Sequence, residues 1–140
     1  MNTTILIAYD GSAPAERAVL FANSHFDDAR YVLVTVVDPY ERLYGAYGSV
    51  DLDTVAGRDP TASGEELLAE ARDQLDPDAE VELVVGVGRP AHAILAEADE
   101  HDVDHIVIGS HGRSGTERLL LGSVAETVLR RATVPVTVVR

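Results

Sequence analysis

The feature that most constrains the fold is a regular alternation of apolar runs with segments of helical period. Apolar runs typical of buried strands occupy residues 3–9, 31–37, 80–87, 104–109 and 134–139. Segments with apolar residues at helical spacing occupy residues 12–26, 63–75, 90–101 and 123–132. Parallel neighbouring strands need a long crossover, which is usually a helix. The alternation therefore predicts an α/β fold with a mostly parallel sheet that helices cover on both faces.

Capping residues predict where several of these helices begin. Ser12 stands at the N-cap position of the first helix, and Pro14 falls in its first turn, where a missing N–H costs little. The second helix opens with the capping box Ser63-x-x-Glu66, which predicts a start at residue 63. The third helix is expected to begin at Pro90.

The chain length predicts a single domain. At 140 residues it is long enough for one domain with its own core and short for two, so we expect one domain over residues 1–140. Residues 38–62 form a long connection without a clear period, which predicts a mobile loop. Tyr40, Tyr44 and Tyr47 in this loop are spaced at i, i+4 and i+7. Either a helical turn presents the three rings to a ligand or partner subunit, or they are incidental residues of a disordered loop.

The charge balance excludes two classes of partner. The chain has 24 acidic residues against 11 basic ones, all of them arginine, and a formal net charge of −13. Nucleic acids and anionic membranes require a basic face, so neither is expected as a main partner. An acidic, lysine-free surface favours adaptation to a salty cytoplasm, where salt screens the repulsion between carboxylates. A GC-rich genome that prefers arginine is the alternative explanation.

The composition also points to a location. The chain has no cysteine, which excludes disulfides, a thiol nucleophile and cysteine-bound metals. No apolar stretch approaches the roughly 20 residues that span a bilayer. The first residues, "MNTTILIAYDGS", lack a basic start and enter a strand at once, unlike a signal peptide. We therefore expect a cytoplasmic protein.

A glycine-rich segment after the fourth apolar run predicts an anion site. It reads "GSHGRSGTERLLLGSV" over residues 109–124. In open parallel sheets ligands bind beyond the carboxyl ends of the strands, near the point where strand order reverses. Gly109, Gly112 and Gly115 let the backbone turn tightly and bring N–H groups close to a ligand. Ser123 then begins a helix whose first N–H groups and partial positive charge face the same place. Two such groups of donors predict a polyphosphate ligand.

Other residues of this segment have two interpretations each. Arg113 and Arg118 can add positive charge to the site. Ser123 and Glu126 form a capping box, so the serine hydroxyl either caps its helix or binds the ligand. His111 either donates to the anion or faces solvent. A lysine-containing phosphate loop is excluded because the chain has no lysine.

The spacing Gly109-x2-Gly112-x9-Gly122-Ser123 resembles the nucleotide motif of the universal stress protein family, in its ATP-binding branch. The segments "ILIAYDGS", "VVDP", "GVGRPAHAIL", "IVIGSHGRSG" and "VPVTVV" agree with the same family, so the resemblance covers essentially the whole chain. It implies a Rossmann-like fold of the adenine nucleotide alpha hydrolase type: an open, doubly wound, five-stranded parallel sheet in the order 3-2-1-4-5. It also implies a homodimer through the last strand, whose edge at Val136 and Val138 would otherwise invite uncontrolled pairing.

The resemblance also implies roles for individual residues. Adenine would lie between the first two strand ends, lined by Ala8, Tyr9 and Asp10 and contacted by the backbone of Val36. Asp10 would accept hydrogen bonds from the ribose, unless it serves with Ser12 as the cap of the first helix. The ribose and phosphates would be held by Gly109, Ser110, His111, Gly112, Arg113, Ser114 and Gly115. The far phosphates would be enclosed by Gly122, Ser123 and Val124.

These observations leave three hypotheses for the function. The first is a stress-response module that binds ATP, with Mg²⁺ on its phosphates, without efficient turnover. The second is a slow or partner-activated ATPase, but hydrolysis requires a base that orients water. The nearest acids, Glu117 and Glu126, are expected at the surface or in a cap, and we predict no catalytic residue and no metal site in the protein. The third is a dimeric interaction protein with an empty pocket, against which the intact glycine motif speaks.

Overall fold

The computed structural model describes residues 2–39, 60–112 and 121–140 and contains every strand and helix that the sequence predicts. The strands are β1 (Thr4–Ala8), β2 (Arg30–Val37), β3 (Val81–Val87), β4 (His105–Gly109) and β5 (Val136–Val139). The helices are α1 (Ala13–His25), α4 (Pro60–Asp73), α5 (Pro90–Glu100) and α6 (Ser123–Arg131). The apolar runs and the helical periods thus identified all the described elements.

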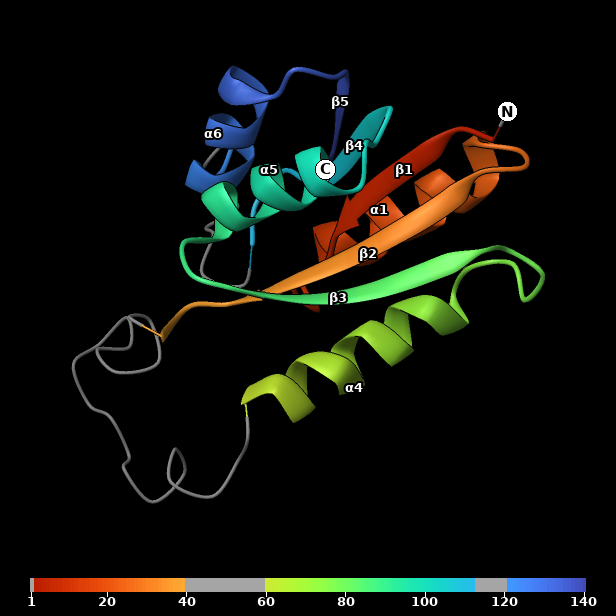
Figure 1. Cartoon of the computed structure of the whole chain (residues 1–140), viewed down its shortest axis with the longest axis horizontal. Helices are drawn as coiled ribbons and strands as arrows, with labels where there is room; N and C mark the ends of the chain where they lie inside the picture. The colour runs from red at the N-terminus through yellow and green to blue at the C-terminus, as the bar shows by residue number, and fades with distance from the viewer. Residues whose placement is uncertain (1, 40–59, 113–120) are drawn as a thin grey trace.

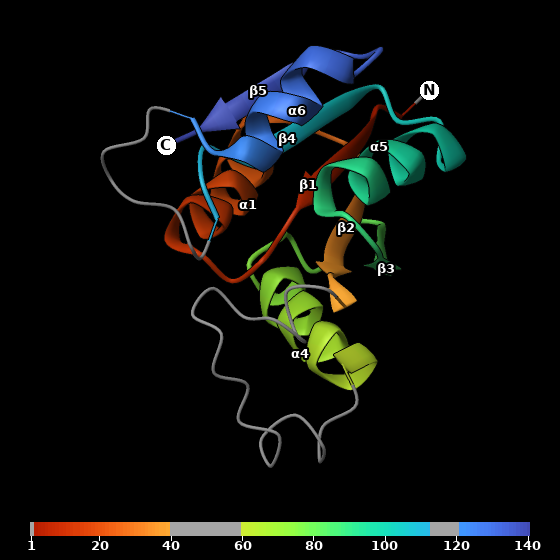
Figure 2. The same ribbon diagram turned by 90° about the vertical axis from the view of Figure 1, so that its left-hand side faces the viewer.

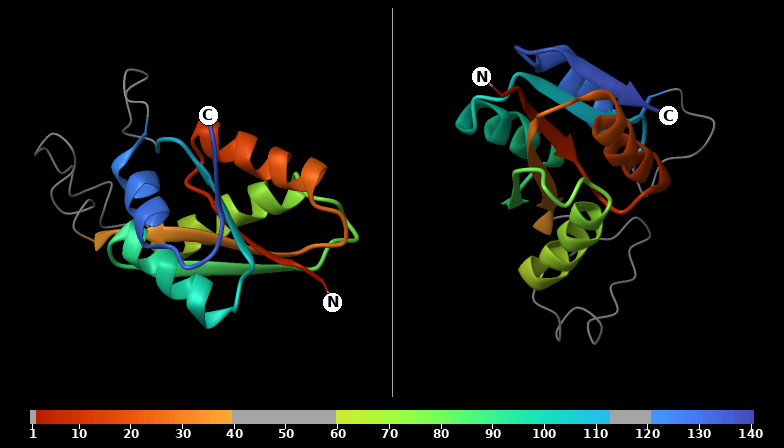
Figure 3. Two further views of the ribbon diagram at one scale, coloured as in Figure 1. Left: turned by 90° about the horizontal axis from the view of Figure 1, so that it is seen from above. Right: turned by 90° about the vertical axis from the view of Figure 1, so that its right-hand side faces the viewer.

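The five strands form one parallel sheet in the order β3-β2-β1-β4-β5 (Figure 1). This confirms the open, doubly wound sheet. The chain adds β2 and β3 on one side of β1, and β4 and β5 on the other side. The carboxyl ends of β1 and β4 therefore flank the switch point where open sheets bind ligands. Helices α1 and α4 cover one face, and α5 and α6 cover the other (Figures 2 and 3).

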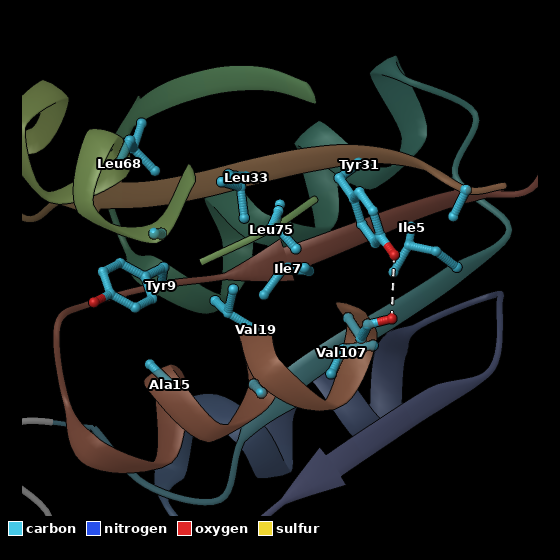
Figure 4. Packing of buried hydrophobic residues seen from close by; sticks show 14 residues of the cluster. Ile5, Ile7, Tyr9, Ala15, Val19, Tyr31, Leu33, Leu68, Leu75 and Val107 are labelled. Carbon is cyan, nitrogen blue, oxygen red and sulfur yellow. Dashed lines mark hydrogen bonds between the residues drawn. The ribbon is translucent and has the colours of Figure 1, made fainter. Parts of the chain in front are cut away.

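Each face of the sheet has its own apolar core, because side chains alternate along the strands. On one face Ile5, Ile7 and Leu33 pack against Val19 of α1 and Leu68 of α4 (Figure 4). All five side chains are fully buried, and each contributes about 1.5–3 kcal/mol of transfer free energy. The other core contains the following buried residues of the sheet and of α5 and α6: Leu6, Val32, Val34, Ile94, Ile106 and Val128.

The predicted helix starts are confirmed for α1, α5 and α6, which begins at Ser123, and wrong for α4. The Ser12 hydroxyl accepts the N–H of Ala15 at 3.3 Å and caps α1, and α5 begins at Pro90. Helix α4 begins at Pro60 rather than at Ser63, so Ser63 lies inside the helix and does not cap it. Proline fixes a helical φ and lacks the N–H that a first turn cannot use, so Pro60 is the better start.

Candidate functional site

The predicted site residues lie at the carboxyl ends of β1, β2 and β4 and at the start of α6. Strand β1 ends at Ala8, where the chain leaves the sheet after the N–H of Tyr9 donates to the Val34 carbonyl at 2.8 Å. Strand β2 continues to Val37, and Val36 turns its N–H and C=O to the same side as Val34. The backbone of Val36 therefore faces the space beyond the end of β1, as its predicted contact with adenine requires.

The side chains of Ala8 and Tyr9 are part of the two cores. Tyr9 is 2% exposed and packs between α1 and α4 (Figure 4). Ala8 belongs to the core on the opposite face. Burial raises the pKa of the Tyr9 hydroxyl, and the carboxylates of Glu16 and Glu70 raise it further. The Tyr9 ring is thus a neutral core residue, and position 9 can line a ligand only with its backbone.

Asp10 reaches from the end of β1 to the loop after β4. Its Oδ1 accepts the N–H of Ser12 at 3.0 Å, and its Oδ2 lies so close to Gly112 that a Cβ there would be 2.7 Å away. Ser12, not Asp10, is the N-cap of α1. The carboxylate therefore supports the turn into α1 with one oxygen and faces the glycine loop with the other, across the switch point.

Gly109 and Gly122 lie where two backbone segments of the protein pack closely together. A Cβ on Gly109 would lie 2.9 Å from the backbone of Pro14 and Ala15 in the first turn of α1. Gly122 donates its N–H to the Ser110 carbonyl at 2.6 Å, and a Cβ there would lie 3.1 Å from the Cα of His111. These glycines are required by close packing, which joins the β4 loop to the first turns of α1 and α6. The glycine-rich sequence predicts the close approach of a ligand, but at these two positions the close atoms belong to the protein.

Helix α6 begins without a side-chain cap. Its N-cap is Gly122, Ser123 is its first residue, and in the described part of the chain no side chain accepts from its first N–H groups. The capping-box interpretation of Ser123 is therefore wrong: the residue sits one position too late, and its hydroxyl lies on an exposed residue. An uncapped helix start presents unpaired N–H groups and the positive end of the macrodipole. It is suited to bind an anion.

Ser110 and His111 connect β4 to this helix start. Ser110 is 3% exposed, its N–H donates to the Val139 carbonyl at 2.7 Å, and its Oγ lies 3.2 Å from Nδ1 of His111. The half-buried His111 lies beside Gly122, at the amino end of α6. Val124 follows Ser123 in the first turn of α6 and packs partly against the core.

Several predicted residues lie outside the described part of the chain. They are Arg113, Ser114, Gly115, Glu117 and Arg118 of the glycine-rich segment, with Tyr40, Tyr44 and Tyr47 of the long connection. Within residues 2–39, 60–112 and 121–140, no group of three or more histidine or acidic side chains is placed to hold a metal ion. No helix in these ranges is long and apolar enough to cross a membrane.

The described part of the chain also contains a pocket that no sequence motif predicted. A cavity of about 230 Å³ lies between α5, α6 and the amino ends of β4 and β5, with Leu95, Ile106 and Val134 among its lining residues. It is at the opposite end of the strands from Asp10 and Gly112, so it is separate from the predicted crevice. Asp102 and Arg131 lie at this cavity and have no role in the glycine motif.

Comparison with known proteins identifies close relatives over the whole chain. A model of the universal stress protein family matches residues 1–140. The universal stress protein encoded beside a QAH/OAS sulfhydrylase in Thermus aquaticus is 35% identical over 140 residues, which cover 100% of both chains. The universal stress protein Rv2005c of Mycobacterium tuberculosis is 32% identical over 99% of this chain, but the chain spans only 46% of that protein.

Solved structures share the fold. The protein MJ0577 is 28% identical with a TM-score of 0.75, over 99% of this chain and 96% of its own. A universal stress protein in complex with cAMP is 26% identical with a TM-score of 0.64, over 99% and 97% of the two chains. A universal stress protein of Archaeoglobus fulgidus in complex with dAMP is 25% identical with a TM-score of 0.62, over 100% and 98%.

Proposed function

The chain belongs to the universal stress protein family, and on this premise we propose that it binds an adenine nucleotide at the carboxyl ends of β1, β2 and β4. The relatives in complex with cAMP and dAMP support the ligand class. We further propose that the cellular ligand is ATP with Mg²⁺ on its phosphates, and that occupancy regulates a stress response. Gly112, which faces the Asp10 carboxylate across the switch point, supports this finer assignment, whereas close packing already explains Gly109 and Gly122.

The observation that carries the proposal is the convergence of Asp10, Gly112 and the start of α6 at the switch point. The Asp10 carboxylate would accept hydrogen bonds from ribose hydroxyls, because carboxylates accept without donating. The first N–H groups of α6, from Ser123 and Val124, would hold the far phosphates. Val36 would contact the adenine edge through its backbone. This division places the carboxylate at the sugar and the positive helix end at the phosphates.

Efficient turnover would require a base near the terminal phosphate. In the described part of α6 the acid is Glu126, which pairs with Arg130 at 2.9 Å and is half exposed. An acid held in a surface pair one turn inside the helix is poorly suited to orient a water at the γ-phosphate. This supports binding without efficient hydrolysis over the slow ATPase, the second candidate.

We also propose a cytoplasmic homodimer through β5. The Ile106 and Ser110 N–H groups donate to the carbonyls of Pro135 and Val139, so the odd-numbered residues of β5 face β4. Val136 and Val138 consequently turn their N–H and C=O groups outward, ready for another strand. The exposed Leu20 and Leu129 lie on α1 and α6, which both contact β5, and a second copy would cover apolar surface there. The absence of cysteine is compatible with a reducing cytoplasm.

Calorimetric titration of the protein with ATP, AMP and cAMP, each with and without Mg²⁺, tests the proposal. We expect tightest binding for Mg-ATP, and a large loss for Asp10→Asn, whose amide replaces one accepting oxygen. Release of phosphate from labelled ATP measures turnover in the same samples. No binding of any of the three nucleotides would refute the assignment, and rapid hydrolysis would favour the ATPase.

A further inference from the structure

The outer edge of β3 pairs with no other strand of the described part of the chain. In the described part of the chain β3 pairs only with β2, and its sequence VELVVGV contains no proline or lysine. Leu83 and Val87 are 45% and 67% exposed, and both lie on this strand. Folded proteins usually protect such edges with charges, proline, bulges or a covering segment, because a free edge pairs with other strands.

Half of the backbone groups of β3 are turned outward. The carbonyl of Glu80 accepts the N–H of Tyr31 at 2.9 Å, and the N–H of Gly88 donates to the Val37 carbonyl at 3.0 Å. The even-numbered residues therefore bond to β2, and the odd-numbered ones face away from it. The outward residues are Val81, Leu83, Val85 and Val87.

We propose that β3 pairs antiparallel with β3 of a second copy of this chain, with Val85 at the two-fold axis. In this register Val85 lies opposite Val85 of the second copy, and Leu83 lies opposite Val87 of the second copy. All these residues turn their backbone outward, so each opposed pair can exchange two hydrogen bonds. The exposed Leu83 and Val87 side chains lie on the same face, and each would cover the other.

The charges along the edge favour the same arrangement. The amino end of β3 carries Glu80 and Glu82, and Arg89 follows its carboxyl end. Antiparallel pairing places the acidic end of one copy beside Arg89 of the other, and the two-fold axis repeats the contact. Glu82 already pairs with Arg30 at 2.7 Å and lies 3.4 Å from His101. Two copies that meet at this edge would therefore repel each other less than the net charge of −13 suggests.

This contact is separate from the dimer proposed through β5, because β3 and β5 are opposite edges of the sheet. Both contacts are two-fold and use different surfaces, so one protein can make both. Each β5 dimer carries two β3 edges, so association through β3 links β5 dimers into an open chain with a continuous sheet. It does not depend on nucleotide binding, and it can fail while the proposed function holds.

A cysteine introduced at the two-fold axis tests the register, because the chain has no cysteine of its own. Opposed residues that exchange both hydrogen bonds have Cα atoms about 5.5 Å apart, within disulfide range. Val85→Cys should therefore form disulfide-linked dimers on mild oxidation. Val81→Cys is the matched control: it lies on the same strand and also faces outward, but in this register it is far from its own copy.

Non-reducing electrophoresis and sedimentation velocity measure the result, and circular dichroism checks that both variants are folded. We expect at least tenfold more covalent dimer for Val85→Cys than for Val81→Cys, and a large reduction when Leu83→Lys is added. Leu20→Lys changes a leucine of similar exposure (52% against 45%) beside β5, at the opposite edge of the sheet, and should leave the covalent yield of Val85→Cys unchanged. Equal yields for the two cysteine variants, or a yield unaffected by Leu83→Lys, would overturn the proposal.

Discussion

Replacing Gly112 with alanine tests the contact between the glycine loop and Asp10. A Cβ at position 112 would lie 2.7 Å from Oδ2 of Asp10. Non-bonded carbon and oxygen atoms prefer a separation about 0.5–1 Å larger, so the carboxylate must move by roughly that distance. The backbone itself tolerates alanine, because the described glycines with positive φ are Gly11 and Gly88, not Gly112.

The expected loss follows from the bonds that the displaced carboxylate would make to a ribose. A hydrogen bond to a charged group contributes about 1.5–3 kcal/mol, so losing one such bond lowers affinity by roughly 10- to 100-fold. The stability of the fold should change little. Alanine restricts the unfolded chain and stabilises by about 0.4–1 kcal/mol, which offsets part of the strain at Asp10.

Calorimetric titration with Mg-ATP, together with thermal unfolding, separates the two effects. Gly86→Ala is the control, because a Cβ there would lie 3.5 Å from the nearest side chain, Ala93 Cβ, an ordinary contact. We expect Gly112→Ala to lose affinity with a nearly unchanged Tm, and Gly86→Ala to retain both. Parental affinity in Gly112→Ala, with loss of binding in Asp10→Asn, would show that the loop does not position the carboxylate.

Three further predictions concern the edge strand, pH and salt. Val138→Pro removes an outward N–H of β5 and should abolish the proposed β5 contact without unfolding the chain, so that the mass in light scattering falls; an unchanged mass would contradict this. Burial lowers the pKa of His105 from its ordinary 6.5, so protonation favours the unfolded chain and stability should fall as pH drops from about 7 toward 5. His105→Gln should flatten that fall in urea titrations, and an identical pH profile would refute it. Mg-ATP affinity should hold or rise, and Tm should rise, as KCl increases from about 0.1 M to about 1 M; a steep loss of affinity would contradict short-range capture.

The order of elements could be predicted because each has a period that only one kind of structure satisfies. Ile5, Ile7 and Leu33 belong to apolar runs too short for helices and too continuous for loops. Period alone does not determine which strand lies beside which. The order β3-β2-β1-β4-β5 came from the resemblance of the glycine motif and strand ends to a known family, and the structure confirms it.

Details that depend on contacts between distant segments could not be read from local patterns. Ser123 matches a capping box, yet Gly122 is the N-cap because its N–H bonds to Ser110 and brings the helix start against His111. Gly109 is a glycine because α1 crosses it, which no local signal indicates. The position of Tyr9 was within reach, since it continues the alternation of Ile5 and Ile7 into the same core.

The arrangement at the switch point gives a physical reason why a chain of net charge −13 could bind the proposed polyanion. In the described part of the chain, the Asp10 carboxylate faces Gly112 from the end of β1, where a ribose rather than a phosphate would lie. The phosphates would meet the start of α6, whose partial charge acts within about one helical turn. Glu126 in this turn is paired with Arg130 at 2.9 Å, and salt screens charges that lie farther apart more strongly than such short contacts. The net negative charge of the chain and the proposed anion site would therefore act at different distances, and either could change without the other.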